Sequence, residues 1–204
     1  MDRIAEQIIQ FMDVVEKLCY VERFATMKNG RKEYDSDHIM KLAFLVLMVS
    51  EFLDNKIDKV KLLEMVLIHD LAEADTGDIS YMEQYDNPDI IKRKKTQELR
   101  TISNYKNLLP TVIKNKILDL FLEYEKEETI ESKIVRTLDK LEGDLQCLKD
   151  INIQSYCNHN AFLSRINTLK KHKYSDKTNE KIIYSMECIL LEISKEIIKK
   201  SKKK

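Results

Sequence analysis

Helix breakers are scarce in this chain, whose 204 residues include only three Gly and two Pro. Gly and Pro punctuate turns, so a chain that nearly lacks them favours long helices over a turn-rich β fold. Apolar residues also recur at helical spacing in most windows, as in the stripe formed by Ile4, Ile8, Val15 and Leu18. We therefore expect an all-α fold.

The same pattern predicts where the helices lie. We expect them over residues 2–20, 37–54, 58–74, 89–109, 111–127, 129–150 and roughly 178–200. Asp58 is suited to cap the third helix, Gly77 to stop it, and Pro110 to open a later one. With no long linker or internal repeat, we expect one domain over residues 1–204: a core of about 15–150, C-terminal helices over 151–198 and a basic tail at 199–204. Residues 151–177 are the least clear segment.

Charge and composition exclude several classes of protein. The segment SKEIIKKSKKK at residues 194–204 holds six Lys and one Glu, so the rest of the neutral chain has a net charge of −5. An acidic body argues against a nucleic-acid groove as the main function. No apolar run approaches the ~20 residues that cross a bilayer, and we expect neither a signal peptide nor membrane association. The four Cys residues lack CxxC spacing, which suits reduced thiols in a cytoplasmic protein.

The segment LIHDLAEADTGDI at residues 67–79 concentrates titratable groups in an apolar, helical context. Unpaired buried charges are costly to desolvate, so such a cluster favours a bound cation. His69 and Asp70 can share a metal ion only if other elements supply further ligands, and His38 and Asp139 are candidates. A surface Asp139 paired with Arg136 or Lys140, and a His38 that merely begins a helix, are the alternatives.

Two imidazoles and two carboxylates suit one divalent first-row ion, such as Mn, Fe, Co, Ni or Zn. Such an ion acidifies water and polarises a phosphoryl oxygen. Glu73 would share a helix face with His69 and Asp70, where a carboxylate outside the ligand set can orient or deprotonate water. Asp78, just beyond Gly77, would reach the same opening.

The ordered pattern of His38, His69–Asp70 and Asp139 resembles the HD-domain phosphohydrolase superfamily, whose members are all-helical. HDLAEADTGDISYMEQYDNP (69–88) and ERFATMKNGRKEYDSDH (22–38) narrow the resemblance to the bacterial 5′-deoxynucleotidases of that superfamily. The resemblance covers about residues 15–95 and 133–148 and fades in the C-terminal quarter.

The resemblance implies hydrolysis of (deoxy)nucleoside 5′-monophosphates to nucleoside and phosphate. It makes His38, His69, Asp70 and Asp139 the metal ligands, and it makes Glu73 and Asp78 the catalytic carboxylates. Arg23 would bind the 5′-phosphate, and Phe24 stands where the group usually has Trp beside the sugar. Members of the group commonly form homodimers. The alternatives are a related hydrolase acting on a cyclic nucleotide, a nucleoside triphosphate or an alarmone, and a helical scaffold without activity.

Overall fold

Helices form nearly all of the regular structure in the computed structural model, which describes residues 2–153, 157–171 and 177–202. The chain runs through α1 (Asp2–Lys17), β1 (Glu22–Thr26), β2 (Lys32–Tyr34), α2 (Asp35–Ser50), α3 (Lys59–Ile68), α4 (Glu73–Thr76), α5 (Tyr81–Asp86), α6 (Pro88–Tyr105), α7 (Thr111–Lys126), α8 (Ile130–Lys149), α10 (His159–Leu169) and α11 (Thr178–Ser201). The all-α prediction is confirmed. No helix within these ranges is long and apolar enough to span a bilayer.

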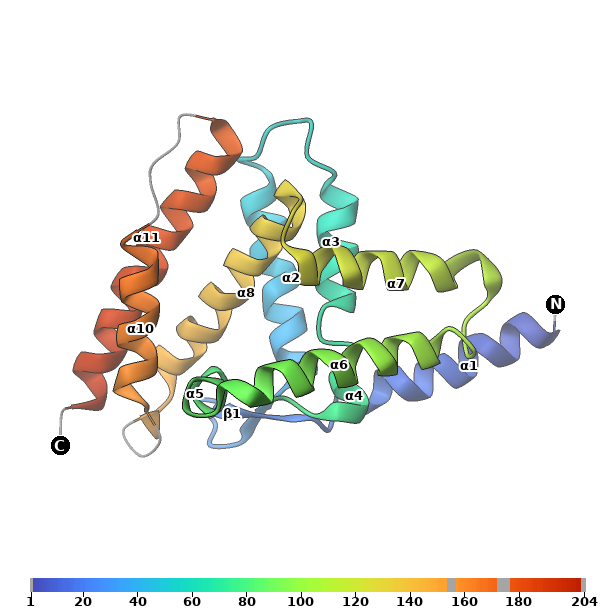
Figure 1. Cartoon of the computed structure of the whole chain (residues 1–204), viewed down its shortest axis with the longest axis horizontal. Helices are drawn as coiled ribbons and strands as arrows, with labels where there is room; N and C mark the ends of the chain where they lie inside the picture. Colours follow the sequence, from blue (N-terminus) through green and yellow to red (C-terminus); the bar gives the residue numbers. More distant parts are fainter. Residues whose placement is uncertain (1, 154–156, 172–176, 203–204) are drawn as a thin grey trace.

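The helices α2, α3 and α8 pack against one another in the middle of the molecule (Figure 1). Leu42 of α2, Leu62 of α3 and Leu138 of α8 are almost fully buried in one hydrophobic cluster. Helix α7 covers α3 and α8 from another side, while α11 packs along α8, and α10 packs against α11. This packing fixes the relative positions of α2, α3 and α8, and the predicted metal ligands lie in or directly after these three helices.

Local sequence explains where several helices begin. The Asp58 carboxylate accepts a hydrogen bond from the Lys61 backbone N–H at 2.9 Å, so the predicted cap of α3 is confirmed. Pro110 directly precedes α7, also as predicted. Gly77 has a φ of 74°, which an L side chain rarely adopts, and the chain leaves the helical path there.

The expectation of one continuous helix over residues 58–74 is wrong. Helix α3 ends at Ile68, and tight turns follow in which the N–H groups of Leu71 and Glu73 bond the carbonyls three residues earlier. Glu73 then opens the short helix α4. The expected relation of Glu73 to His69 on one helix face therefore does not arise, and the turns set their relative positions instead.

A β-hairpin before α2 was not predicted. Strands β1 and β2 pair antiparallel around Gly30, whose φ is 88°. Buried side chains at the C-terminal end of α8 hold the hairpin in place, because Gln146 of α8 donates to the Thr26 carbonyl at 3.1 Å and Asp150, just after α8, accepts from the Thr26 N–H at 2.6 Å.

Helix α10 lies within residues 151–177, the segment that was least clear from the sequence. Residues 154–156 and 172–176 of this segment lie outside the described residues.

Candidate metal centre and adjoining cavity

The predicted ligand residues come from three elements that meet in the core. His38 lies in the first turn of α2, His69 and Asp70 follow the end of α3, and Asp139 lies in the middle of α8. Both imidazoles are buried, whereas the Asp139 side chain keeps about a fifth of its surface exposed, at 21%. The centre therefore lies inside the protein and opens to solvent on the carboxylate side.

Three side chains, His38, His69 and Asp139, offer ligand atoms within 4.8 Å of one another at this point, and Asp70 lies beside both imidazoles. His38 Nε2 lies 3.2 Å from Asp139 Oδ1 and 3.4 Å from His69 Nε2. His69 Nε2 lies 3.1 Å from Asp70 Oδ2, and 3.7 Å separate Asp70 Oδ2 from His38 Nε2. Bonds of about 2.0–2.2 Å to a single first-row ion place neighbouring ligand atoms about 3 Å apart. The spacing of His38, His69 and Asp139 suits one ion, and Asp70 would complete the ligand set from beside the two imidazoles.

The second nitrogen of each imidazole already has an acceptor. His38 Nδ1 lies 2.6 Å from Glu142 Oε2, and His69 Nδ1 lies 2.8 Å from the Val66 carbonyl oxygen. These acceptors fix the proton on Nδ1 and leave the Nε2 lone pair toward the centre. The donor set and its tautomers therefore fit a divalent cation.

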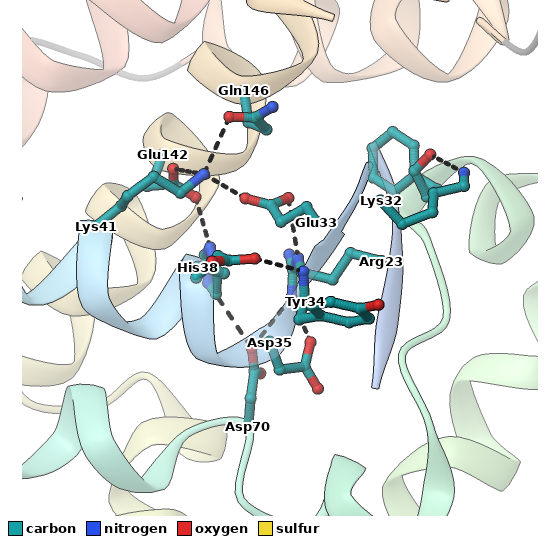
Figure 2. A network of polar contacts seen from close by, with 12 residues as sticks. Arg23, Lys32, Glu33, Tyr34, Asp35, His38, Lys41, Asp70, Glu142 and Gln146 are labelled. Carbon is teal, nitrogen blue, oxygen red and sulfur yellow. Dashed lines mark hydrogen bonds and ion pairs between the residues drawn. The ribbon is translucent and has the colours of Figure 1, made fainter. Parts of the chain in front are cut away.

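Glu142 belongs to a buried network that supports His38 (Figure 2). Its second oxygen lies 2.7 Å from Lys41 Nζ, which also pairs with Glu33 and bonds Gln146 Oε1 at 3.1 Å. Since Lys41 balances the negative charge of Glu142, the carboxylate stays fixed and ionised. Burial raises the pKa of Glu142, but the hydrogen bond from His38 and the charges of His38 and Lys41 hold it below its ordinary value.

The surroundings of Asp139 favour its ionised form and fix its orientation. Burial raises the pKa of Asp139, yet when the imidazoles are doubly protonated, the hydrogen bond from His38 and the charges of His69 and His38 hold it well below its usual range; a bound cation would take the place of those Nε2 protons. The Tyr124 hydroxyl donates to the other Asp139 oxygen at 2.8 Å, which orients the carboxylate toward the imidazoles. The ring of Tyr124 packs edge-on against His69.

Glu73 lies beside the centre and is almost fully buried. Its Oε1 accepts a hydrogen bond from Lys94 Nζ at 2.7 Å, and Lys94 also pairs with Glu98 at 3.2 Å. Its Oε2 is buried without a hydrogen-bond partner among the described residues. Burial, then the charges of Asp70 and Asp78, raise the pKa of Glu73 well above its ordinary value.

Arg23 joins the candidate ligands to the hairpin. Its Nη1 lies 3.3 Å from Asp70 Oδ2 and 3.3 Å from Asp35 Oδ1, while its Nε lies 3.6 Å from Glu33. Burial raises the pKa of Asp35 to about 7; the charge of Asp70 adds to this, and Arg23 opposes it. Arg23 therefore provides a fixed cation next to the carboxylates (Figure 2).

A cavity of about 300 Å³ opens beside the centre. Arg23, Phe24, Glu73 and Asp78 line it together with His69, Asp70 and Asp139; His38 lies behind this wall. Cationic side chains line it as well, including Lys94, Lys95, Arg136, Lys140 and Arg165. This arrangement suits an anionic ligand whose charged group lies at the candidate metal centre.

Several other titratable residues take no part in the centre. Asp75 forms a surface ion pair with Lys17 at 2.6 Å. His159 bonds Ser201 Oγ at 2.7 Å, and His172 lies outside the described residues. The alternative pairing of Asp139 with Arg136 is not favoured by the contacts, since Arg136 lies 3.0 Å from Glu127 and Asp139 faces His38.

Sequence reasoning missed three side chains that shape the site. Glu142 lies three residues after Asp139 on the same helix face, a spacing that could have identified it. Lys94 belongs to the basic run 92–95, which looks like a solvated surface in sequence alone. Tyr124 gives no local signal, because its contact with Asp139 joins two different helices.

Comparisons with known proteins identify the family of this chain. The chain is 33% identical over 147 residues to 5′-deoxynucleotidase HDDC2 of Xenopus laevis, covering 71% of this chain and 69% of that protein. It is 28% identical over 144 residues to the human protein of that name, covering 70% and 67%. The crystal structure of a predicted metal-dependent phosphohydrolase from Magnetospirillum magnetotacticum MS-1 shares the fold, with a TM-score of 0.66, 20% identity and coverage of 98% and 95%. An HD domain family model matches residues 15–182, and the chain therefore belongs to the HD domain family.

Proposed function

We propose that this protein is a metal-dependent phosphomonoester hydrolase that releases phosphate from (deoxy)nucleoside 5′-monophosphates. The observation that carries the proposal is the meeting of two imidazoles and Asp139, with Asp70 beside them, next to a cavity lined by both acidic and cationic side chains. The relatives named 5′-deoxynucleotidase support the choice of substrate.

His38, His69, Asp70 and Asp139 would hold one divalent ion, for which Mn, Fe, Co, Ni and Zn are the candidates by ligand type. When bound, the ion supplies positive charge beside the phosphoryl oxygens and makes water more acidic. The role of Glu142 is to hold the His38 ring and its tautomer, and the Val66 carbonyl does the same for His69.

The remaining side chains would act on water and substrate. Glu73 is the proposed general base: in its ionised form it takes a proton from the attacking water as that oxygen bonds phosphorus and the bond from phosphorus to the 5′-oxygen breaks. The 5′-oxygen then takes up that proton and leaves as the nucleoside hydroxyl, which returns Glu73 to its ionised form. Lys94 holds the other side of the Glu73 carboxylate at 2.7 Å. Asp78 would help to position water or substrate. Arg23 would bind the 5′-phosphate, a task that suits its fixed set of donors.

Phe24 would pack near the sugar. The ring lines the cavity next to Arg23, and Lys32 fixes the Phe24 carbonyl with a 2.7 Å hydrogen bond. Phenylalanine lacks the indole N–H of tryptophan, so we expect weaker discrimination between deoxyribose and ribose than in relatives with Trp at this position.

Turnover of dAMP, AMP, dCTP and cyclic AMP by the purified, metal-loaded protein tests the proposal, with the nucleoside or nucleotide product and any released phosphate both measured. We expect nucleoside and phosphate from the monophosphates. Turnover of dCTP alone, or conversion of cyclic AMP to AMP alone, would favour another hydrolase of the family. No turnover of any of them, with metal bound, would favour a scaffold. His69→Ala and Asp70→Ala should each abolish both metal binding and turnover.

The cytoplasmic location stays a prediction, and so does the homodimer. Helix α2 offers a surface that a second copy could cover: Met40, Phe44, Leu47 and Met48 share one face, and each exposes at least half of its area. Together they expose on the order of 400 Å² of apolar surface, comparable to the largest apolar patch on a typical monomer, which is often functional. We propose that two copies associate through this α2 strip.

A further inference from the structure

The cavity extends well beyond the candidate metal centre. At its other end, it is lined by Tyr81 of α5 and by Phe162 and Arg165 of α10. Helix α8 joins the two ends, because Asp139 lies at the metal centre and Asp144 lies at the distant end. None of these distant side chains has a role in the proposed hydrolysis.

Arg165 and Tyr81 form a fixed pair. The guanidinium carbon of Arg165 lies 4.0 Å from the centre of the Tyr81 ring and 5.7 Å from that of Phe162. Asp144 forms an ion pair with Arg165, and Ser194 donates to the second Asp144 oxygen at 2.8 Å. The Tyr81 hydroxyl donates to the Ala161 carbonyl at 3.1 Å. Both planar groups are therefore held in place before any ligand binds.

Gly143 leaves space between the two ends. It lies inside the 20-residue helix α8, where glycine is less favourable than any residue except proline. A Cβ added at Gly143 would meet no atom within 4 Å, so packing does not require glycine at this position. Gly143 also lines the cavity, where even a small side chain would reduce the room for a ligand.

We propose that Tyr81, Arg165 and Gly143 form a nucleobase subsite, in which the base of a nucleoside 5′-monophosphate lies over Gly143 and stacks on the Tyr81–Arg165 pair. Flat aromatic and guanidinium groups are the surfaces on which bases stack in proteins, and such stacking tolerates any base. The inference rests on the proposed function, since it assigns the phosphate to the metal centre and the base to the opposite end.

The test compares two ligands that differ only in the base, a deoxyribonucleoside 5′-monophosphate and 2-deoxyribose 5-phosphate. In the wild-type holoenzyme we expect a kcat/KM about tenfold higher for the nucleotide, on the scale of one base stack. Tyr81→Leu should remove most of this preference by raising the nucleotide KM, with kcat/KM for the sugar phosphate kept within about twofold. Tyr81→Phe keeps the ring and should retain the preference. Tyr85→Leu, on the same helix α5 but away from the cavity, is the matched control.

Gly143→Leu supplies an independent steric test. The substitution should raise the melting temperature, because leucine favours the helix, and should lower kcat/KM for the nucleotide at least about tenfold by filling the cavity. Two results would overturn the subsite. One is that Tyr81→Leu and Gly143→Leu each lower kcat/KM equally for the nucleotide and the sugar phosphate, and the other is that neither variant lowers kcat/KM for the nucleotide.

A binding measurement distinguishes failure of the nucleobase subsite from failure of the proposed hydrolysis. Calorimetric titration of the two ligands into metal-loaded Glu73→Ala protein measures base preference without relying on turnover. Tighter binding of the nucleotide that Tyr81→Leu abolishes supports the subsite even if no phosphate is released, in which case only the hydrolase proposal fails. Phosphate release with equal binding of both ligands leaves the hydrolase proposal standing and refutes the subsite.

Discussion

Replacing Glu142 tests how strongly its hydrogen bond with His38 supports the candidate metal centre. Glu142 Oε2 lies 2.6 Å from His38 Nδ1, and its other oxygen lies 2.7 Å from Lys41. Glu142→Gln keeps the shape and an acceptor oxygen but removes the charge, and charge-assisted hydrogen bonds are about twice as strong as neutral ones. Glu142→Ala removes the acceptor altogether.

Loss of such a partner typically lowers metal affinity by about 10–100-fold. We therefore expect Glu142→Gln to weaken binding about tenfold and Glu142→Ala about a hundredfold, or roughly 1.4 and 2.7 kcal/mol. Competition of the stripped protein with a chelating indicator measures the affinity, and thermal unfolding checks the fold.

Glu33→Gln is the matched control, because Glu33 is also buried and shares Lys41 without an observed contact to His38. Its metal affinity should stay within about threefold of wild type. If Glu142→Ala bound metal as tightly as wild type, the role of Glu142 in orienting His38 would be refuted, and so would our use of that hydrogen bond to assign the tautomer.

Three further predictions concern catalysis, sugar selectivity and assembly. Glu73→Ala should keep stoichiometric metal and lose about 10²–10⁴-fold in kcat, as for loss of a general base; full activity would refute the assignment. Phe24→Trp should raise the ratio of kcat/KM for dAMP to kcat/KM for AMP, and an unchanged ratio would refute the proposed contact between Phe24 and the sugar. Sedimentation velocity should give a dimer that Phe44→Glu combined with Met48→Glu converts to a folded monomer; an unchanged dimer would exclude the α2 strip.

Helical periodicity and the scarcity of breakers predicted most of the fold. The missed hairpin carries a local signal, since Asn29–Gly30 is a common hairpin turn sequence and Gly30 has the positive φ that such turns need. The break after Ile68 has no such signal, because residues 67–74 contain no Gly or Pro and remain compatible with a helix. Tertiary packing overrides the local preference there.

The candidate site was predictable where residues form an ordered motif. His38, His69, Asp70 and Asp139 were proposed together; the structure groups the ligand atoms of His38, His69 and Asp139 and places Asp70 beside both imidazoles, while their role as metal ligands stays a prediction. Arg165 could not be predicted in the same way, because its position depends on how α10 packs against α5 and α11, and distances between separate elements are not encoded in sequence spacing.

Phosphate release during metal titration tests the central claim most directly. The metal-stripped protein is titrated with Mn²⁺ or Co²⁺ while phosphate release from dAMP is followed. Four ligands around one ion predict no release without metal and a rate that saturates at one ion per chain. Release that is independent of metal, or no release with the ion bound, would contradict the account.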